Sequence, residues 1–196
     1  VSEEEKIRLT RELLHKAFSS FSSSKLLSLK NKDEEWILRK HLSTRERLPF
    51  YEEVYGRILS QAKKDSGTHI IDLGAGINGF SHKYLKKINR KIRYLAVESI
   101  GQLVDLTNYY FKKNKIKNAA AFHESLFNLN RIKSLIETEN GEKIIFLFKV
   151  LDSLEIIEKD YSKKLLKEIS GSADLIAVSF ATRSMVSRKK FNVSRS

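Results

Sequence analysis

The sequence predicts an α/β protein with a Rossmann-like fold, in which a mainly parallel sheet is flanked by helices. Up to about residue 59, apolar residues recur at helical spacing. From Thr68 onward, short apolar runs alternate with longer amphipathic ones, which is typical of repeated βαβ units. A glycine-rich segment at 74–79 follows the first apolar run, where such a strand turns into a helix. We therefore expect a helical appendage over residues 1–66 and a main domain over 67–196.

The N-terminal appendage is expected to contain three helices. Helical spacing of apolar side chains predicts the first over 3–18, and a serine-rich stretch over 19–24 predicts a flexible link after it. The second is expected to start near Asp33, whose carboxylate can cap it. The third is expected after Pro49, which suits the first turn of a helix.

The main domain is expected to alternate strands and helices from Thr68. The expected strands lie at residues 68–73, 92–97, 118–123, 143–151 and 173–181. The expected helices between them lie at 79–89, 101–114, 127–137 and 157–170.

The composition excludes several classes of protein. No segment approaches the roughly 18 uninterrupted apolar residues of a membrane span, and the acidic N-terminus does not resemble an export signal, so a soluble cytoplasmic protein is expected. The absence of cysteine excludes disulfides, thiolate zinc sites and a cysteine nucleophile. The histidines lack metal-ligand spacing, so no metal is expected, and we assume a monomer.

The positive charge of the chain favours a polyanionic partner. It has 37 Lys and Arg against 24 Asp and Glu, a formal net charge of +13. Phosphate backbones are drawn to such cations because binding releases counterions. Solvated helix faces would give the same pattern in any single cluster, and both interpretations stay open. The candidate RNA-binding residues are Lys86, Lys87, Arg90, Lys91, Arg188, Lys189 and Lys190. A further cluster consists of Lys112, Lys113, Lys115 and Lys117.

The glycine-rich segment is the first candidate for a ligand site. Gly74, Gly76 and Gly79 match G-x-G-x-x-G, and Glu98 ends the expected second strand, a combination that also suits a dinucleotide. Asp72 favours S-adenosylmethionine (AdoMet) instead, because its carboxylate would repel a pyrophosphate but attract the ammonium of the methionine moiety. Glu98 would then accept hydrogen bonds from the ribose hydroxyls.

Further cofactor contacts are expected at the same edge of the sheet, where the carboxyl ends of parallel strands meet. Ala75 lies between two glycines of the loop. Glu124 follows the expected third strand and would lie beside the adenine amino group, with Ser125 next to it. The alternative is that these acidic residues are ordinary polar residues at strand ends.

Three further segments resemble the motifs of a known protein family, and together with the Asp72 loop they occur in the same order along the chain as in that family. They are H-L-S-T-R-E-R-L-P at 41–49, F-L-F-K-V-L at 146–151 and V-S-F-A-T-R-S at 178–184. Over about residues 35–190 the chain resembles the 16S ribosomal RNA methyltransferases of the Arm/Rmt type, which confer aminoglycoside resistance and belong to the class I AdoMet-dependent methyltransferases.

The resemblance implies methyl transfer to N7 of a guanosine in the decoding region of 16S rRNA, with the 30S subunit as partner. N7 carries a lone pair that is not tied to a proton, so positioning and electrostatics can replace a strong general base. The target base must first be unstacked into a pocket. The resemblance makes Arg47, then Arg45, candidates for the AdoMet carboxylate. Lys149, Arg183 and Phe180 are the candidates for catalytic contacts with the base.

Purely structural roles are the alternatives for these residues. The two arginines could form ion pairs at a helix start, and Phe180 could pack in the core. The first 34 residues share only the helical character of the family's ribosome-docking domain. The antiparallel hairpin that usually ends this fold is also missing before Ser196. A methyltransferase of another RNA such as tRNA, a non-catalytic RNA-binding protein with a residual AdoMet site, and a nicotinamide oxidoreductase are the competing hypotheses.

Overall fold

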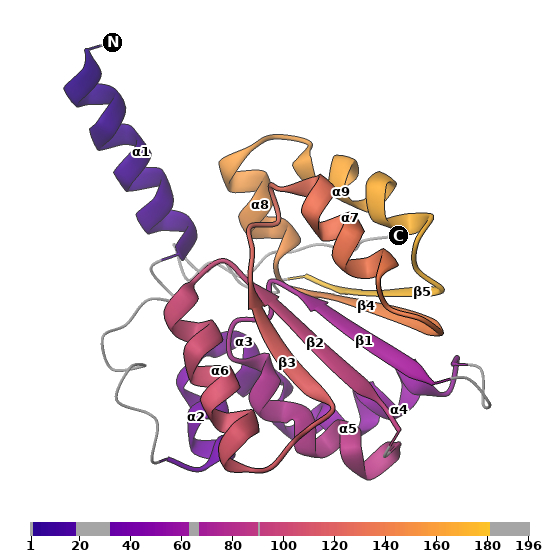
Figure 1. Ribbon diagram of the computed structural model, residues 1–196. Helices are drawn as coiled ribbons and strands as arrows, with labels where there is room; N and C mark the ends of the chain where they lie inside the picture. The colour runs from indigo at the N-terminus through magenta and orange to yellow at the C-terminus, as the bar shows by residue number, and fades with distance from the viewer. Residues whose placement is uncertain (1, 19–31, 63–66, 90, 181–196) are drawn as a thin grey trace.

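The centre of the protein is a five-stranded parallel sheet (Figure 1). The computed structural model describes residues 2–18, 32–62, 67–89 and 91–180. The strands are β1 (Thr68–Leu73), β2 (Arg93–Glu98), β3 (Ala119–His123), β4 (Glu142–Phe148) and β5 (Leu175–Ser179). Every neighbouring pair in the order β3-β2-β1-β4-β5 is parallel, which confirms the predicted α/β fold.

The strand order reverses between β1 and β4. The chain runs outward from β1 through β2 to β3 and then crosses to β4 on the other side of β1. The connections after β1 and β4 therefore leave the sheet in opposite directions, which opens a crevice at the carboxyl ends of these strands. This edge of the sheet is where the sequence predicts the cofactor-binding residues.

Four helices cover one face of the sheet (Figure 1). They are α2 (Glu34–Lys40), α4 (Tyr51–Leu59), α5 (His82–Ile88) and α6 (Gly101–Lys113). Leu38 and Tyr55 are fully buried in one apolar cluster with Ile70 and Phe146 of the sheet. The Asp33 side chain accepts a hydrogen bond from the Trp36 backbone N–H at 2.8 Å, which confirms the predicted cap of α2. Helices from the N-terminal segment thus share a core with the sheet.

Three helices cover the opposite face (Figure 1). They are α7 (Leu129–Glu137), α8 (Leu151–Ile157) and α9 (Tyr161–Ser170). Ile71 and Leu73 of β1 pack there, whereas Ile70 packs on the first face. Both faces of β1 are buried, which explains why apolar residues on this strand are not restricted to alternate positions, although Thr68, His69 and Asp72 are also buried there.

The structure corrects the sequence prediction around the end of β4. The expected strand 143–151 stops at Phe148, and α8 begins at Leu151. The expected helix 157–170 starts later, as α9 begins at Tyr161 after a turn at Asp160, which has a φ of +62°. Leu151 packs in the same apolar cluster as the strand, so the sequence pattern does not mark the boundary.

Short helical elements at the cofactor edge were also only partly predicted. The prediction left residues 42–47 without a helix, but they form α3 (Leu42–Arg47), which is followed by the 3₁₀ turn η2 (Leu48–Phe50). A second 3₁₀ turn, η3 (Asn78–Ser81), precedes α5 where one continuous helix was expected. These elements place the first family motif and the glycine loop at the same end of the sheet.

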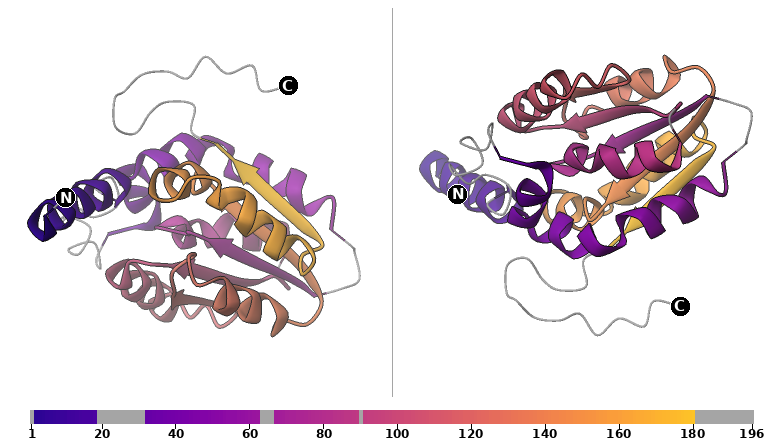
Figure 2. Two further views of the ribbon diagram at one scale, coloured as in Figure 1. Left: turned by 90° about the horizontal axis from the view of Figure 1, so that it is seen from above. Right: turned by 90° about the horizontal axis from the view of Figure 1, so that it is seen from below.

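The first helix, α1 (Glu3–Phe18), confirms the prediction of a helix over these residues. It projects from one end of the molecule and contacts α8 (Figure 2). In the described part of the chain, none of the helices combines the length and apolar character that a bilayer-spanning segment requires.

A substitution in α2 tests whether the N-terminal helices stabilise the whole protein. Leu38 is fully buried, so Leu38→Ala should lower the free energy of unfolding by about 2–5 kcal/mol in a single transition. Leu9→Ala, at an exposed position of α1, should change it by at most about 0.5 kcal/mol. Urea denaturation followed by circular dichroism measures both. A separate early transition in the Leu38→Ala variant, with the main one unchanged, would contradict the shared core.

Candidate functional site

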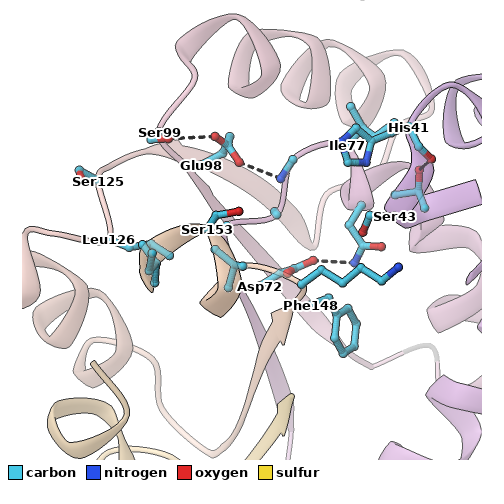
Figure 3. A pocket seen from close by; sticks show the side chains of 18 of the residues that line it. His41, Ser43, Asp72, Ile77, Glu98, Ser99, Ser125, Leu126, Phe148 and Ser153 are labelled. Carbon is cyan, nitrogen blue, oxygen red and sulfur yellow. Dashed lines mark hydrogen bonds between the residues drawn. The ribbon is translucent and has the colours of Figure 1, made fainter. Parts of the chain in front are cut away.

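A cavity that opens to solvent lies at the carboxyl edge of the sheet, and its empty space, counted together with the solvent at its opening, is about 870 Å³ (Figure 3). It is bounded by the glycine loop, the ends of β1, β2 and β4, the segment after β3, and helices α3 and α8. The predicted cofactor or catalytic residues that line it are Arg47, Asp72, Gly74, Ala75, Gly76, Glu98, Ser125 and Lys149. The structure therefore brings together residues that are up to about a hundred positions apart in sequence.

The glycine loop after β1 has a backbone that only glycine adopts easily. Gly74 and Gly76 have φ values of +72° and +53°. A Cβ on Gly74 would lie 2.4 Å from the Val150 Cγ2 atom, so no side chain fits between the loop and the end of β4. The loop backbone consequently borders the cavity, while the Gly74 and Ala75 N–H groups donate to the Val97 carbonyl.

Glu98 at the end of β2 is fixed against this loop. Its Oε2 accepts a hydrogen bond from the Gly76 N–H at 2.8 Å, and its Oε1 accepts one from the Ile100 N–H at 2.9 Å. Figure 3 shows the carboxylate between the loop and Ser99. The Ser99 hydroxyl also donates to Oε1, at 3.2 Å. A carboxylate can accept about four hydrogen bonds, so Glu98 keeps acceptor capacity for about one more, from a hydroxyl group of a ligand.

Asp72 is a buried carboxylate at the end of the central strand. It is 1 % exposed, and its Oδ2 accepts hydrogen bonds from the Asn78 amide at 2.7 Å and the Tyr94 hydroxyl at 2.5 Å. Burial raises the pKa of Asp72 above its ordinary value, and the two hydrogen bonds oppose that rise. Since both hydrogen bonds end on Oδ2, Oδ1 remains as the acceptor for a cationic group in the cavity.

Arg47 of α3 supplies the complementary charge. Its guanidinium donates to the Ser43 hydroxyl at 2.8 Å and to the Asn78 side-chain oxygen at 3.3 Å, and it lies 5.0 Å from the centre of the Phe148 ring. Its Nε is buried and has no hydrogen-bond partner among the described residues. A buried N–H without an acceptor costs free energy, so the site suits a ligand carboxylate.

Lys149 follows β4 directly and has an unusual backbone. Its φ is +59°, a conformation that side chains other than glycine adopt rarely and that often marks functional sites. Its backbone N–H donates to the Ser179 carbonyl at 2.9 Å, and its ammonium forms an ion pair with Glu46 of α3. The ion pair joins α3 to the end of β4 across the mouth of the cavity.

Other predicted site residues lie outside the cavity lining. Arg45 is exposed on α3. Glu124 accepts a hydrogen bond from the Ser125 N–H at 2.9 Å and approaches Arg131, so its carboxylate supports the turn before α7. Phe180 follows β5 and is 43 % exposed. Arg183 falls outside the described residues, and the predicted roles of these four residues stay predictions.

The predicted RNA-binding lysines that fall within the described residues lie at the opposite edge of the sheet from the cavity. Helices α5 and α6 start at the carboxyl edge and run back, so Lys86 and Lys87 at the end of α5 and Lys91 before β2 lie at the amino edge. Lys87 pairs with Glu52. The positive charges of Lys86 and Lys87 also interact favourably with the carboxyl end of α5, which is a structural alternative to RNA binding. Arg90, Arg188, Lys189 and Lys190 fall outside the described residues.

Sequence reasoning missed several polar residues of the cavity, and Asn78 and Ser153 are two of them. Asn78 touches Asp72, Arg47 and Tyr51, and nothing but its place in the glycine loop signals this. Ser153 of α8 has a buried hydroxyl without a hydrogen-bond partner in the described part of the chain, and α8 was not predicted there. The described residues contain no cluster of three or more His, Cys, Asp or Glu side chains that could hold a metal ion.

Comparison with protein families decides the kind of protein. Residues 33–195 match the family described as ribosomal RNA methyltransferase (FmrO). The chain belongs to this family. Family membership confirms the predicted class of enzyme, an rRNA methyltransferase, and AdoMet is the methyl donor that this class uses. The charges around the cavity fit AdoMet, which has an α-amino acid end and a ribose.

Solved structures show the same fold. The 16S rRNA methyltransferase RmtF, solved with S-adenosyl-L-homocysteine, is 22% identical with a TM-score of 0.71, over 94% of this chain and 69% of that one. The plantazolicin methyltransferase BpumL, also solved with this compound, is 16% identical with a TM-score of 0.51, over 89% and 60%. The kinase-methyltransferase WbdD is 14% identical with a TM-score of 0.56, over 78% and 32%. Among curated proteins, the sequence has no significant match.

The raised pKa of Asp72 predicts a pH dependence of cofactor binding. The ionised carboxylate attracts an ammonium and the protonated form does not. Affinity for S-adenosylhomocysteine, measured by calorimetry, should therefore fall as the pH drops through a value above the ordinary pKa of Asp72. Asp72→Asn should weaken binding about tenfold at neutral pH and remove this part of the pH dependence. Equal pH profiles for the two proteins would refute the role of Asp72.

Proposed function

We propose that this rRNA methyltransferase transfers the methyl group to N7 of a guanosine in the decoding region of 16S rRNA. The observation that carries the proposal is that Asp72 and Arg47 line the same cavity, which the glycine loop borders, in a chain of this family. Similarity to the 16S rRNA methyltransferase RmtF supports the choice of RNA. Aminoglycoside resistance follows from the proposal as a consequence of altered ribosomes.

The cavity residues divide the work of holding the cofactor. Asp72 Oδ1 would accept a hydrogen bond from the ammonium of the methionine moiety, and the Arg47 guanidinium would bind its carboxylate. Glu98 accepts hydrogen bonds from the ribose hydroxyls, and the Gly74–Gly76 backbone allows close approach. When bound, AdoMet supplies an electrophilic methyl group carried on a sulfonium.

Catalysis at N7 makes few chemical demands on the protein. The N7 lone pair lies in the plane of the base and carries no proton, so the enzyme needs to align the base rather than deprotonate it. We infer that Lys149, which lines the cavity and whose ammonium pairs with Glu46, contacts the target base. The base must be unstacked to reach this point.

The proposal also concerns partners and location. We infer that the 30S subunit is the substrate, that the enzyme acts as a monomer without a metal, and that it works in the cytoplasm, where ribosomal subunits are found. The net charge of +13 supports an RNA partner. Residues 1–66 and the C-terminal cations Arg188, Lys189 and Lys190 are the proposed additional RNA contacts.

Methyl transfer from radiolabelled AdoMet tests the proposed reaction. Purified 30S subunits, naked 16S rRNA and bulk tRNA are offered in parallel, and labelled positions are mapped by cleavage at N7-methylguanosine. We expect label on a guanosine of the decoding region and at least about a hundredfold less with Asp72→Ala. Label confined to tRNA, or at a different atom of the base, would refute the assignment.

A second substitution separates catalysis from cofactor binding. Lys149→Met keeps a long side chain but removes the charge, so methyl transfer should fall about tenfold or more while affinity for S-adenosylhomocysteine changes less than about twofold. Lys143→Met, at the other end of β4, serves as the control and should retain full activity. A parallel loss of binding in Lys149→Met would make this lysine part of the cofactor site instead.

A further inference from the structure

Two opposite charges in the cavity are held apart by a neutral amide. The Arg47 guanidinium donates to Asn78 Oδ1 at 3.3 Å, and the Asn78 amide nitrogen donates to Asp72 Oδ2 at 2.7 Å. Asn78 is 1 % exposed and lines the cavity between the two charges. Figure 3 shows the hydrogen bond that joins the amide to Asp72. No direct ion pair between Arg47 and Asp72 is formed in the described structure.

The partners of Asn78 fix which way its amide points. A guanidinium has no acceptor and an ionised carboxylate has no donor, so the amide oxygen must face Arg47 and the amide nitrogen must face Asp72. The Tyr51 hydroxyl donates to the same oxygen at 2.8 Å and supports this orientation. The amide dipole is therefore aligned between a cation and an anion and stabilises both.

An α-amino acid end is a zwitterion, with an ammonium and a carboxylate on the same carbon atom. A receptor for it needs an anion and a cation that are close together but not paired with each other. A direct Arg47–Asp72 ion pair would satisfy both charges internally, and a zwitterionic ligand would have to break that ion pair before binding. A neutral spacer avoids this competition.

We propose that Asn78 is a positioning residue that keeps Arg47 and Asp72 apart as separate receptors for the carboxylate and ammonium of the cofactor. This inference rests on the proposed roles of Arg47 and Asp72. In the Asn78→Ala variant the spacer is lost, the flexible Arg47 side chain pairs with Asp72, and the amino acid end of the ligand loses both receptors.

Two ligands distinguish this role from a merely structural one. S-Adenosylhomocysteine carries the α-amino acid end, whereas 5′-methylthioadenosine has the same nucleoside and a thioether but no amino acid. Calorimetry should show that Asn78→Ala raises the Kd of S-adenosylhomocysteine about tenfold or more and changes that of methylthioadenosine less than about twofold. With RNA substrate, KM for AdoMet should rise while KM for RNA does not.

The matched control is a second asparagine whose amide is fully used. The Asn108 amide donates to the Ala121 carbonyl at 2.8 Å and accepts from the Ala121 N–H at 2.9 Å, away from the cavity. Asn108→Ala should lower the melting temperature but leave both Kd values unchanged. If Asn78→Ala does not fold, Tyr51→Phe can replace it, because it removes one hydrogen bond to the Asn78 oxygen. Tyr51→Phe should raise the Kd of S-adenosylhomocysteine about two- to fivefold and leave that of methylthioadenosine unchanged.

Two outcomes overturn the inference in different ways. If Asn78→Ala, or Tyr51→Phe in its place, weakens the binding of both ligands equally or of neither, the spacer role is wrong while the proposed cofactor site stands. If the unsubstituted protein binds methylthioadenosine but gains nothing from the amino acid end of S-adenosylhomocysteine, the roles of Arg47 and Asp72 fail, and the inference fails with them.

Discussion

The burial of a carboxylate at the end of the central strand sets the requirements for the surrounding structure. A carboxylate removed from water must be hydrogen-bonded or it destabilises the fold. Tyr94 from β2 and Asn78 from the glycine loop meet that need for Asp72. Asn78 is buried in turn, and Tyr51 and Tyr55 of α4 hydrogen-bond to it. One buried charge thus connects the loop, the sheet and the N-terminal helices through a polar network inside an apolar core.

Features encoded by local pattern could be predicted from the sequence. Strands buried on both faces are short apolar runs, and the cap at Asp33 and the glycines at 74 and 76 have fixed local chemistry. Because parallel strands end at one edge, knowing where β1 and β2 end was enough to place Asp72 and Glu98 in one cavity.

Features that depend on distant partners could not be predicted. Asn78 acquires its role from Tyr51 and Arg47, which lie in helices 27 and 31 positions earlier in the chain. Lys149 has a left-handed backbone although no glycine or asparagine marks the turn, so the predicted strand continued too far. Glu124 was assigned to the ligand from its place after β3; its carboxylate also contacts neighbouring groups at 125 and 131, and the assignment stays a prediction.

Several lysines in the described part of the molecule are concentrated at one edge of the sheet. Lys86, Lys91, Lys112, Lys115 and Lys117 lie at the amino edge of the sheet, away from the cavity. A large polyanion is attracted to that edge as well as to the cations near the cavity, because long-range attraction depends on charge and not on the position of the pocket. Early encounter complexes therefore include some in which the amino edge contacts the RNA and the cavity faces away from it. These complexes must rotate or dissociate before reaction. Total RNA affinity at low salt consequently overstates the fraction of enzyme that is productively bound.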